Sequence, residues 1–159
     1  MSWVPLQTVT LSGSQSSITF SNIPNSFRDL VVTFSGDGPN SGSNEIFGRF
    51  NGDTNGNYNR VYAGGNGSST YSATNLNQSA MGIMAPAQGR IINFVWNIMD
   101  YSTNDRHKTS LVRDNDAGFQ VVMRSFRWAN TAAINSVSVF IGSGNLYAGS
   151  VVSLYGISG

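Results

Sequence analysis

Few side chains in this sequence have the chemistry of a nucleophilic or thiolate site. The 159 residues include one histidine and no cysteine. A Ser-His-Asp arrangement needs a base oriented by a buried carboxylate, and nothing in the polar stretch 101–108 around His107 predicts one. The absence of cysteine removes disulfides and thiolate metal sites. The sequence therefore predicts a surface histidine and no nucleophilic catalytic site.

Paired carboxylates are the second chemistry to consider, because many glycosidases are rich in β-structure. Such a pair needs two acids across a cleft, one of them with a raised pKa. Most of the eight acids stand beside Asn, Gly or Ser, in predicted turns where a carboxylate usually accepts hydrogen bonds from backbone N–H groups. Sequence alone leaves a pair open, but we expect no enzymatic activity. The acids are Asp29, Asp37, Glu45, Asp53, Asp100, Asp105, Asp114 and Asp116.

The stretch 51–57 has oxygen-bearing side chains at every second position, as a calcium loop does. Asn51, Asp53, Asn55 and Asn57 supply these oxygens. A calcium loop also needs a later bidentate glutamate, and here only Asp53 carries a formal charge. We therefore expect a turn rich in Asn and Gly, with no metal and no cofactor.

Aromatic residues and an arginine share one side of the predicted strand 119–129. Alternation along a strand places Arg124 on the same side as Phe126 and Trp128. Arg, Trp and Tyr recur at interface hot spots, and exposed aromatic rings also bind sugars. We take these three residues and Trp3 as candidate partner contacts. The alternative is a core strand with Arg124 at the sheet margin.

The composition limits the possible partners. Charged residues make up 11% of the chain, against roughly 25% in ordinary soluble domains. A formal net charge of +1 without a Lys/Arg run gives no footprint for nucleic acid. Neither a signal peptide nor a span of ~18 apolar residues is present, so we expect no membrane contact. Protein molecules with weakly charged surfaces repel one another only weakly, which favours self-association or docking on a larger assembly.

Apolar and polar residues alternate along most of the chain, the pattern of β-strands. Residues 90–100 are apolar on both faces and predict a central strand, whereas the Asn-Gly pairs in 51–59 predict a hairpin between 45–50 and 60–63. A short helical turn at 104–108 is the one exception to the all-β pattern. We predict a single domain, residues 1–159, folded as a two-sheet antiparallel β-sandwich, jelly-roll-like. Further strands are expected at 9–11, 18–20, 30–34, 108–113, 119–129, 133–142 and 149–157, with 70–85 an edge strand or a long excursion.

Three stretches together resemble small virion structural proteins and fibre modules of tailed phages, particularly those that infect cyanobacteria and other aquatic bacteria. The match extends over nearly the whole chain and depends on the order and spacing of the stretches. They are QTVTL with SITFSNIP and FRDLVV (7–11, 17–24, 27–32), RFNGDT with NY (49–54, 57–58), and NTAAI with AGSVVSLYGI (130–134, 148–157).

The resemblance implies a non-enzymatic β-sandwich that forms a homotrimer on the phage particle. Such modules occur as capsid decoration (cement) proteins and as domains of tail fibres. Because the module fills the whole chain and leaves no room for a shaft, we expect a decoration protein. It would bind the major capsid protein at the virion surface after assembly in the cytoplasm of the host bacterium. The alternatives are a tail-fibre module that recognises host-surface glycans through aromatic and Asn-rich loops, and a small glycan hydrolase.

Overall fold

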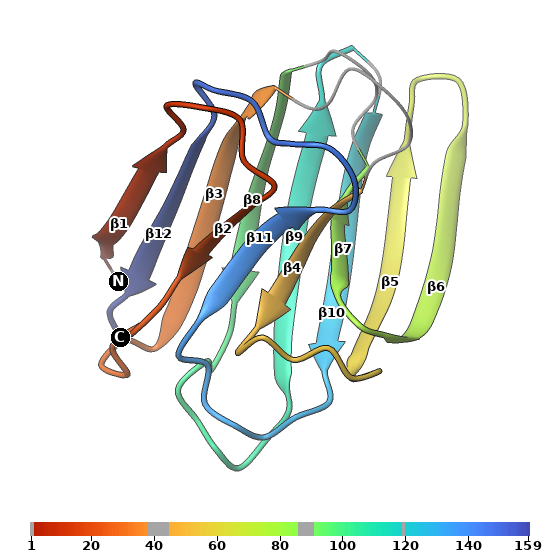
Figure 1. Ribbon diagram of the computed structural model, residues 1–159. Helices are drawn as coiled ribbons and strands as arrows, with labels where there is room; N and C mark the ends of the chain where they lie inside the picture. The colour runs from red at the N-terminus through yellow and green to blue at the C-terminus, as the bar shows by residue number, and fades with distance from the viewer. Residues whose placement is uncertain (1, 38–44, 86–90, 119) are drawn as a thin grey trace.

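The computed structural model describes residues 2–37, 45–85, 91–118 and 120–159, and it contains two antiparallel sheets packed face to face (Figure 1). The larger sheet has eight strands in the order β1-β12-β3-β8-β9-β10-β5-β6, and the smaller has four in the order β2-β11-β4-β7. The predicted all-β, two-sheet antiparallel sandwich is therefore confirmed, while its jelly-roll character stays a prediction. The strands are β1 (Trp3–Thr10), β2 (Ser17–Phe20), β3 (Asp29–Asp37), β4 (Ile46–Phe50), β5 (Tyr58–Gly65), β6 (Thr70–Gln78), β7 (Met81–Met84), β8 (Ile91–Ile98), β9 (Lys108–Asp116), β10 (Gln120–Trp128), β11 (Val137–Ile141) and β12 (Val151–Ile157).

No helix occurs in the described part of the chain, so none there is long and apolar enough to cross a membrane. The stretch 104–108, where a helical turn was expected, consists of bends that lead into β9. Strand β3 runs to Asp37, and residues 38–44, which follow it, lie outside the described residues.

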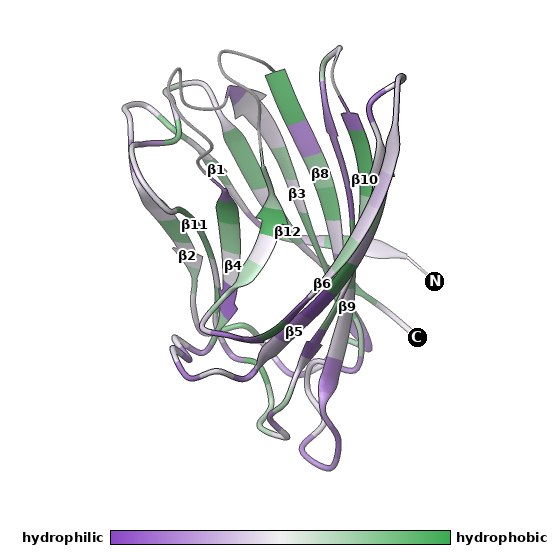
Figure 2. Cartoon of the chain, turned by 90° about the vertical axis from the view of Figure 1, so that its right-hand side faces the viewer, coloured by the Kyte–Doolittle hydropathy of each residue, from purple (hydrophilic) through white to green (hydrophobic). Residues whose placement is uncertain are grey.

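The core lies between the sheets and is built from the inward side chains of both. Figure 2 views the sandwich from the side, with β2, β11 and β4 on one side and β8, β9 and β10 on the other. Trp96 of β8 is fully buried, and its ring stacks on Phe50 of β4 at 5.2 Å between centroids. Phe50 also meets the Trp128 ring edge-on at 5.5 Å. These aromatic contacts join the two sheets.

Strand β8 occupies the central position that its composition predicted. It pairs with β3 on one side and β9 on the other. Its inward residues are buried against the smaller sheet, whereas Ile91, on its outer face, is 60% exposed. Alternating burial is what a sheet covered on one face produces. The inward residues are Ile92, Phe94, Trp96 and Ile98.

The predicted hairpin at 51–59 is wrong. Strand β4 belongs to the smaller sheet and β5 to the larger, so the Asn-rich segment between them connects the two sheets. Asn51 holds this segment to residues distant in sequence: its Nδ2 donates to the carbonyl of Ala133, and its Oδ1 accepts the N–H groups of Asn135 and Ser136. These long-range bonds override the local preference of Asn-Gly for a tight hairpin.

The weakly patterned stretch 70–85 contains two strands that lie at sheet edges. Strand β6 forms a hairpin with β5 and ends the larger sheet, and β7 crosses over to end the smaller sheet beside β4. The expected edge strand is present, together with a second, buried strand formed by the apolar residues 81–84.

Candidate functional site

The structure separates the four residues predicted as partner contacts. Trp3 is 54% exposed on the edge strand β1, where its ring lies 5.4 Å from that of Tyr155. Arg124, Phe126 and Trp128 point into the sandwich and are buried. The expectation that these three side chains present an exposed contact surface is therefore corrected, because all three are buried. The alternative of a core strand describes β10, but Arg124 lies at the middle of this interior strand and not at the sheet margin.

Arg124 forms a buried ion pair with Asp114 on the neighbouring strand β9. Its Nε lies 2.7 Å from one carboxylate oxygen, and its Nη2 lies 3.4 Å from the other. The Arg124 side chain is 4% exposed and that of Asp114 is fully buried. Burial raises the pKa of the Asp114 carboxyl above its ordinary 3.8, against the opposing pull of the Arg124 guanidinium.

A second ion pair lies near the first, since arginines of both pairs approach the Tyr62 ring. Arg60 of β5 reaches across the edge of β7 to Glu45, and its Nη1 donates to the carbonyl of Gly82 at 2.7 Å. A Cβ atom at Gly82 would occupy the space of the Arg60–Glu45 pair. Glycine at this position therefore lets the pair lie against the β7 backbone. The Arg60 guanidinium also lies 4.8 Å from the ring centre of Tyr62, and that of Arg124 lies 5.4 Å from it.

This cluster brings two carboxylates near each other, which is the requirement for acid–base chemistry. Each carboxylate forms an ion pair with an arginine, which neutralises its charge. Glu45 and Asp114 therefore serve as charge partners that seal the margin of the core, rather than as a free acid and a free base. The sequence prediction missed Asp114 because its neighbours suggested a turn. Alternation along β9 would not have shown that Asp114 points inward, because Lys108 and Ser110 on the same side are also polar.

The Asn-rich connection also uses its polar groups internally. The Asp53 carboxylate accepts hydrogen bonds from the Nε1 of Trp128 at 2.7 Å, from Asn57, and from the backbone and side chain of Asn55. Burial alone would raise the pKa of Asp53, but these donors together hold it below its ordinary 3.8. Among the described residues there is no group of three acidic or histidine side chains able to hold a metal ion.

Among the described residues, several exposed aliphatic side chains lie on the outer face of the eight-stranded sheet, the side turned away from the smaller sheet. Aligned registers place Leu111 of β9 beside Ser125 of β10, and Ser125 beside Val61 of β5. In the next row, Met123 lies beside Arg113. Five aliphatic side chains on this face are 37% to 60% exposed, namely Val61, Ile91, Leu111, Val121 and Met123. Exposed apolar side chains gathered on one face are a feature of many interaction surfaces.

The charges on the outer face are few, and those away from its two ends are positive. Arg113 and Arg127 are exposed there, and neither forms an ion pair with any residue that the structure describes. The carboxylates of this face lie at its two ends: Asp29, which pairs with Arg28, and Asp37, beside Ile91. The middle of the face therefore combines aliphatic side chains with unpaired positive charge.

Comparisons with known proteins show no family for this chain. No protein-family model and no curated protein matches this sequence. Among solved structures, the galectin LEC-6 from Caenorhabditis elegans is 7% identical, with 96% of each chain covered and a TM-score of 0.39. The alginate lyase Aly36B is 9% identical, with 94% of this chain and 76% of that chain covered and a TM-score of 0.40. Domain 4 of the arabinanase AbnA from Geobacillus stearothermophilus is 11% identical, with 97% and 74% covered and a TM-score of 0.40.

Proposed function

We propose that the chain is a non-enzymatic structural protein of a tailed-phage virion, a decoration (cement) protein that binds the major capsid protein at the surface of the head. The observation that carries this proposal is the outer face of the eight-stranded sheet, which is apolar, low in charge and uncovered. The sequence resemblance to small virion structural proteins supports the choice of a phage particle as the assembly.

The size of the outer face suits a stable contact. Eight strands spaced about 4.8 Å apart, with about eight residues each at about 3.3 Å per residue, give a face of about 1,000 Å². A standard specific interface buries about 800 Å² on each partner. The unpaired Arg113 and Arg127 favour a partner that presents carboxylates, and they disfavour pairing of this face with the same face of a second copy.

We propose a homotrimer as the state in which the protein sits on the capsid. The exposed Trp3 on the edge strand β1 supports contact between copies at the sheet margin, since Trp is enriched at interface hot spots. Light scattering of the purified protein measures the assembly directly. A mass of three chains that falls to one chain in Trp3→Ser supports the trimer, and a monomeric parent protein contradicts it.

The docking face is tested with phage particles that lack the protein. Purified protein is added back, and the bound amount is measured for the parent chain and for Leu111→Ser with Met123→Ser. Burying one such side chain contributes about 1.5–3 kcal/mol, so the double variant is expected to bind at least about 100-fold more weakly. The matched control is Thr19→Ala on the smaller sheet, which leaves binding unchanged. Equal binding of the double variant and the parent would contradict docking through this face.

A further inference from the structure

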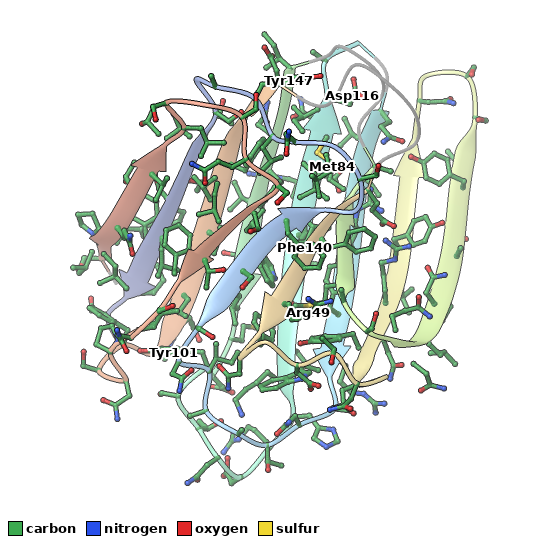
Figure 3. All side chains as sticks on the ribbon, viewed as in Figure 1. Arg49, Met84, Tyr101, Asp116, Phe140 and Tyr147 are labelled. Carbon is green, nitrogen blue, oxygen red and sulfur yellow. The ribbon has the colours of Figure 1, made fainter. Side chains whose placement is uncertain are left out.

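The outer face of the four-stranded sheet, opposite the proposed docking face, has a shallow groove. It lies between β2 and the half-buried ring of Phe140 on β11, and it encloses about 310 Å³. Its lining combines one aromatic ring, one arginine and several hydroxyl groups. The lining residues are Ser16, Ser17, Thr19, Arg49, Ser138, Phe140 and Ile141. Figure 3 shows Arg49 and Phe140 on this side of the molecule.

The register of the sheet determines which side of the Phe140 ring is open. Strand β11 lies between β2 and β4, and Phe140 is paired with Ser17 on one side and Phe47 on the other. Phe47 stacks on Phe140 at 5.5 Å between centroids, and the Arg49 guanidinium lies 4.6 Å from the ring centre. Both neighbours come from β4, so they support the ring from that side. The side of Phe140 toward β2 is left to the groove.

Arg49 is held in place by one of its nitrogens while the others remain available. Its Nε donates to the carbonyl of Ser79 at 3.2 Å. Its two terminal nitrogens have no hydrogen-bond partner or ion pair among the described residues. A guanidinium with two free terminal groups binds a carboxylate through two parallel hydrogen bonds. The groove therefore presents a fixed, unneutralised cation beside an aromatic ring.

Hydroxyl groups form the opposite wall. Thr19 and Ser138 share a hydrogen bond at 2.9 Å, which fixes both side chains, and Ser17 is exposed next to Phe140. Aligned hydroxyls can donate to and accept from the hydroxyls of a sugar, while its C–H face packs on an aromatic ring. A purely apolar ligand would leave these hydroxyls and Arg49 unsatisfied.

We propose that this groove binds an acidic saccharide, with a sugar ring packed on Phe140, its carboxylate on Arg49 and its hydroxyls on Ser17, Thr19 and Ser138. The site depends on the four-stranded sheet alone and is independent of the proposed docking face. A protein bound to the capsid through the opposite sheet would leave this groove facing the solvent.

The test is a titration of the purified full chain with a tetramer of galacturonic acid, followed by amide chemical shifts in NMR and by calorimetry. Maltotetraose, of similar length but without carboxylates, is the neutral comparison. Saturable binding of the acidic tetramer, with shifts at residues 16–19, 49 and 138–141 and at least tenfold weaker binding of maltotetraose, supports the site. Absence of binding, equal binding of the two sugars, or shifts confined to other strands overturns it.

Three variants resolve the contributions. Arg49→Met is expected to weaken binding of the acidic tetramer by about tenfold or more, since it removes a charge-assisted pair of hydrogen bonds. Phe140→Leu keeps the apolar cover of the sheet but removes the flat ring, and it is expected to weaken binding several-fold. Arg127→Met removes the same charge from the opposite sheet and is the control. Equal losses in Arg49→Met and Arg127→Met would show a general charge effect and overturn the site.

Discussion

Replacing Arg124 by methionine separates a structural role from a contact role for this side chain. Methionine preserves most of the packing volume but leaves the Asp114 carboxylate, which is fully buried, without its partner. Removing one member of a buried pair costs about 3–5 kcal/mol. The free energy of unfolding of a small protein falls by about 2 kcal/mol per molar urea, so the urea concentration at the unfolding midpoint should fall by about 2 M. An exposed contact residue would change stability by no more than about 0.5 kcal/mol.

The double variant Arg124→Met with Asp114→Leu isolates the cause. Because both charges are removed together, no unpaired group stays buried, and the free energy of unfolding should return to that of the parent chain or exceed it. Tryptophan fluorescence follows the transition, since Trp96 and Trp128 are buried nearby in the core.

The stability of Arg124→Met should depend on pH through the titration of Asp114. Burial raises the pKa of Asp114 in the folded chain, and loss of Arg124 raises it further. Between the unfolded value near 3.8 and the raised folded value, the folded variant binds a proton that the unfolded chain lacks, so its stability increases as the pH falls. The gap between Arg124→Met and the parent should narrow from pH 7 toward pH 4. A loss below about 1 kcal/mol at pH 7, or a double variant as unstable as the single one, would refute the reasoning.

Three further predictions concern other parts of the fold. Gly48→Ala should cost about 1–3 kcal/mol in thermal unfolding, because a Cβ there would lie 2.6 Å from the Trp96 ring. Asp53→Ala should lower the free energy of unfolding by about 1.5–3 kcal/mol at pH 7, because the hydrogen bonds from Trp128 and the neighbouring donors are lost. The pKa of Asp53 in the folded chain lies below 3.8, so denaturation curves of variant and parent should converge as the pH falls below that value. Met123→Ser should leave the unfolding free energy within about 0.5 kcal/mol, as its side chain is 54% exposed.

The fold was largely predictable because the alternation of side chains reports burial directly. The pattern in 90–100 identified the central strand β8, and 119–129 identified β10 with Arg124, Phe126 and Trp128 correctly on one side. Alternation does not say which side faces the core when both carry large or charged residues. On β10 the outward side contains Val121 and Met123, so hydrophobicity alone could not decide, and the buried side proved to be the one with the arginine.

Features that depend on long-range contacts were not predictable. The Asn-Gly signal at 51–59 predicted a hairpin, whereas in the structure Asn51 bonds to the segment 133–136 and the chain continues into the other sheet. The groove beside Phe140 was missed because Arg49 and Ser17 are distant in sequence and meet only through the register of β2, β11 and β4.

The most direct test of the proposed function is the position and copy number of the protein on the virion. Quantitative mass spectrometry of purified particles, with cryo-electron microscopy of the same preparation, measures both. We predict hundreds of copies on the outer surface of the head, each with the eight-stranded sheet toward the major capsid protein. A handful of copies at the tail, or none on the particle, would contradict the assignment as a capsid decoration protein.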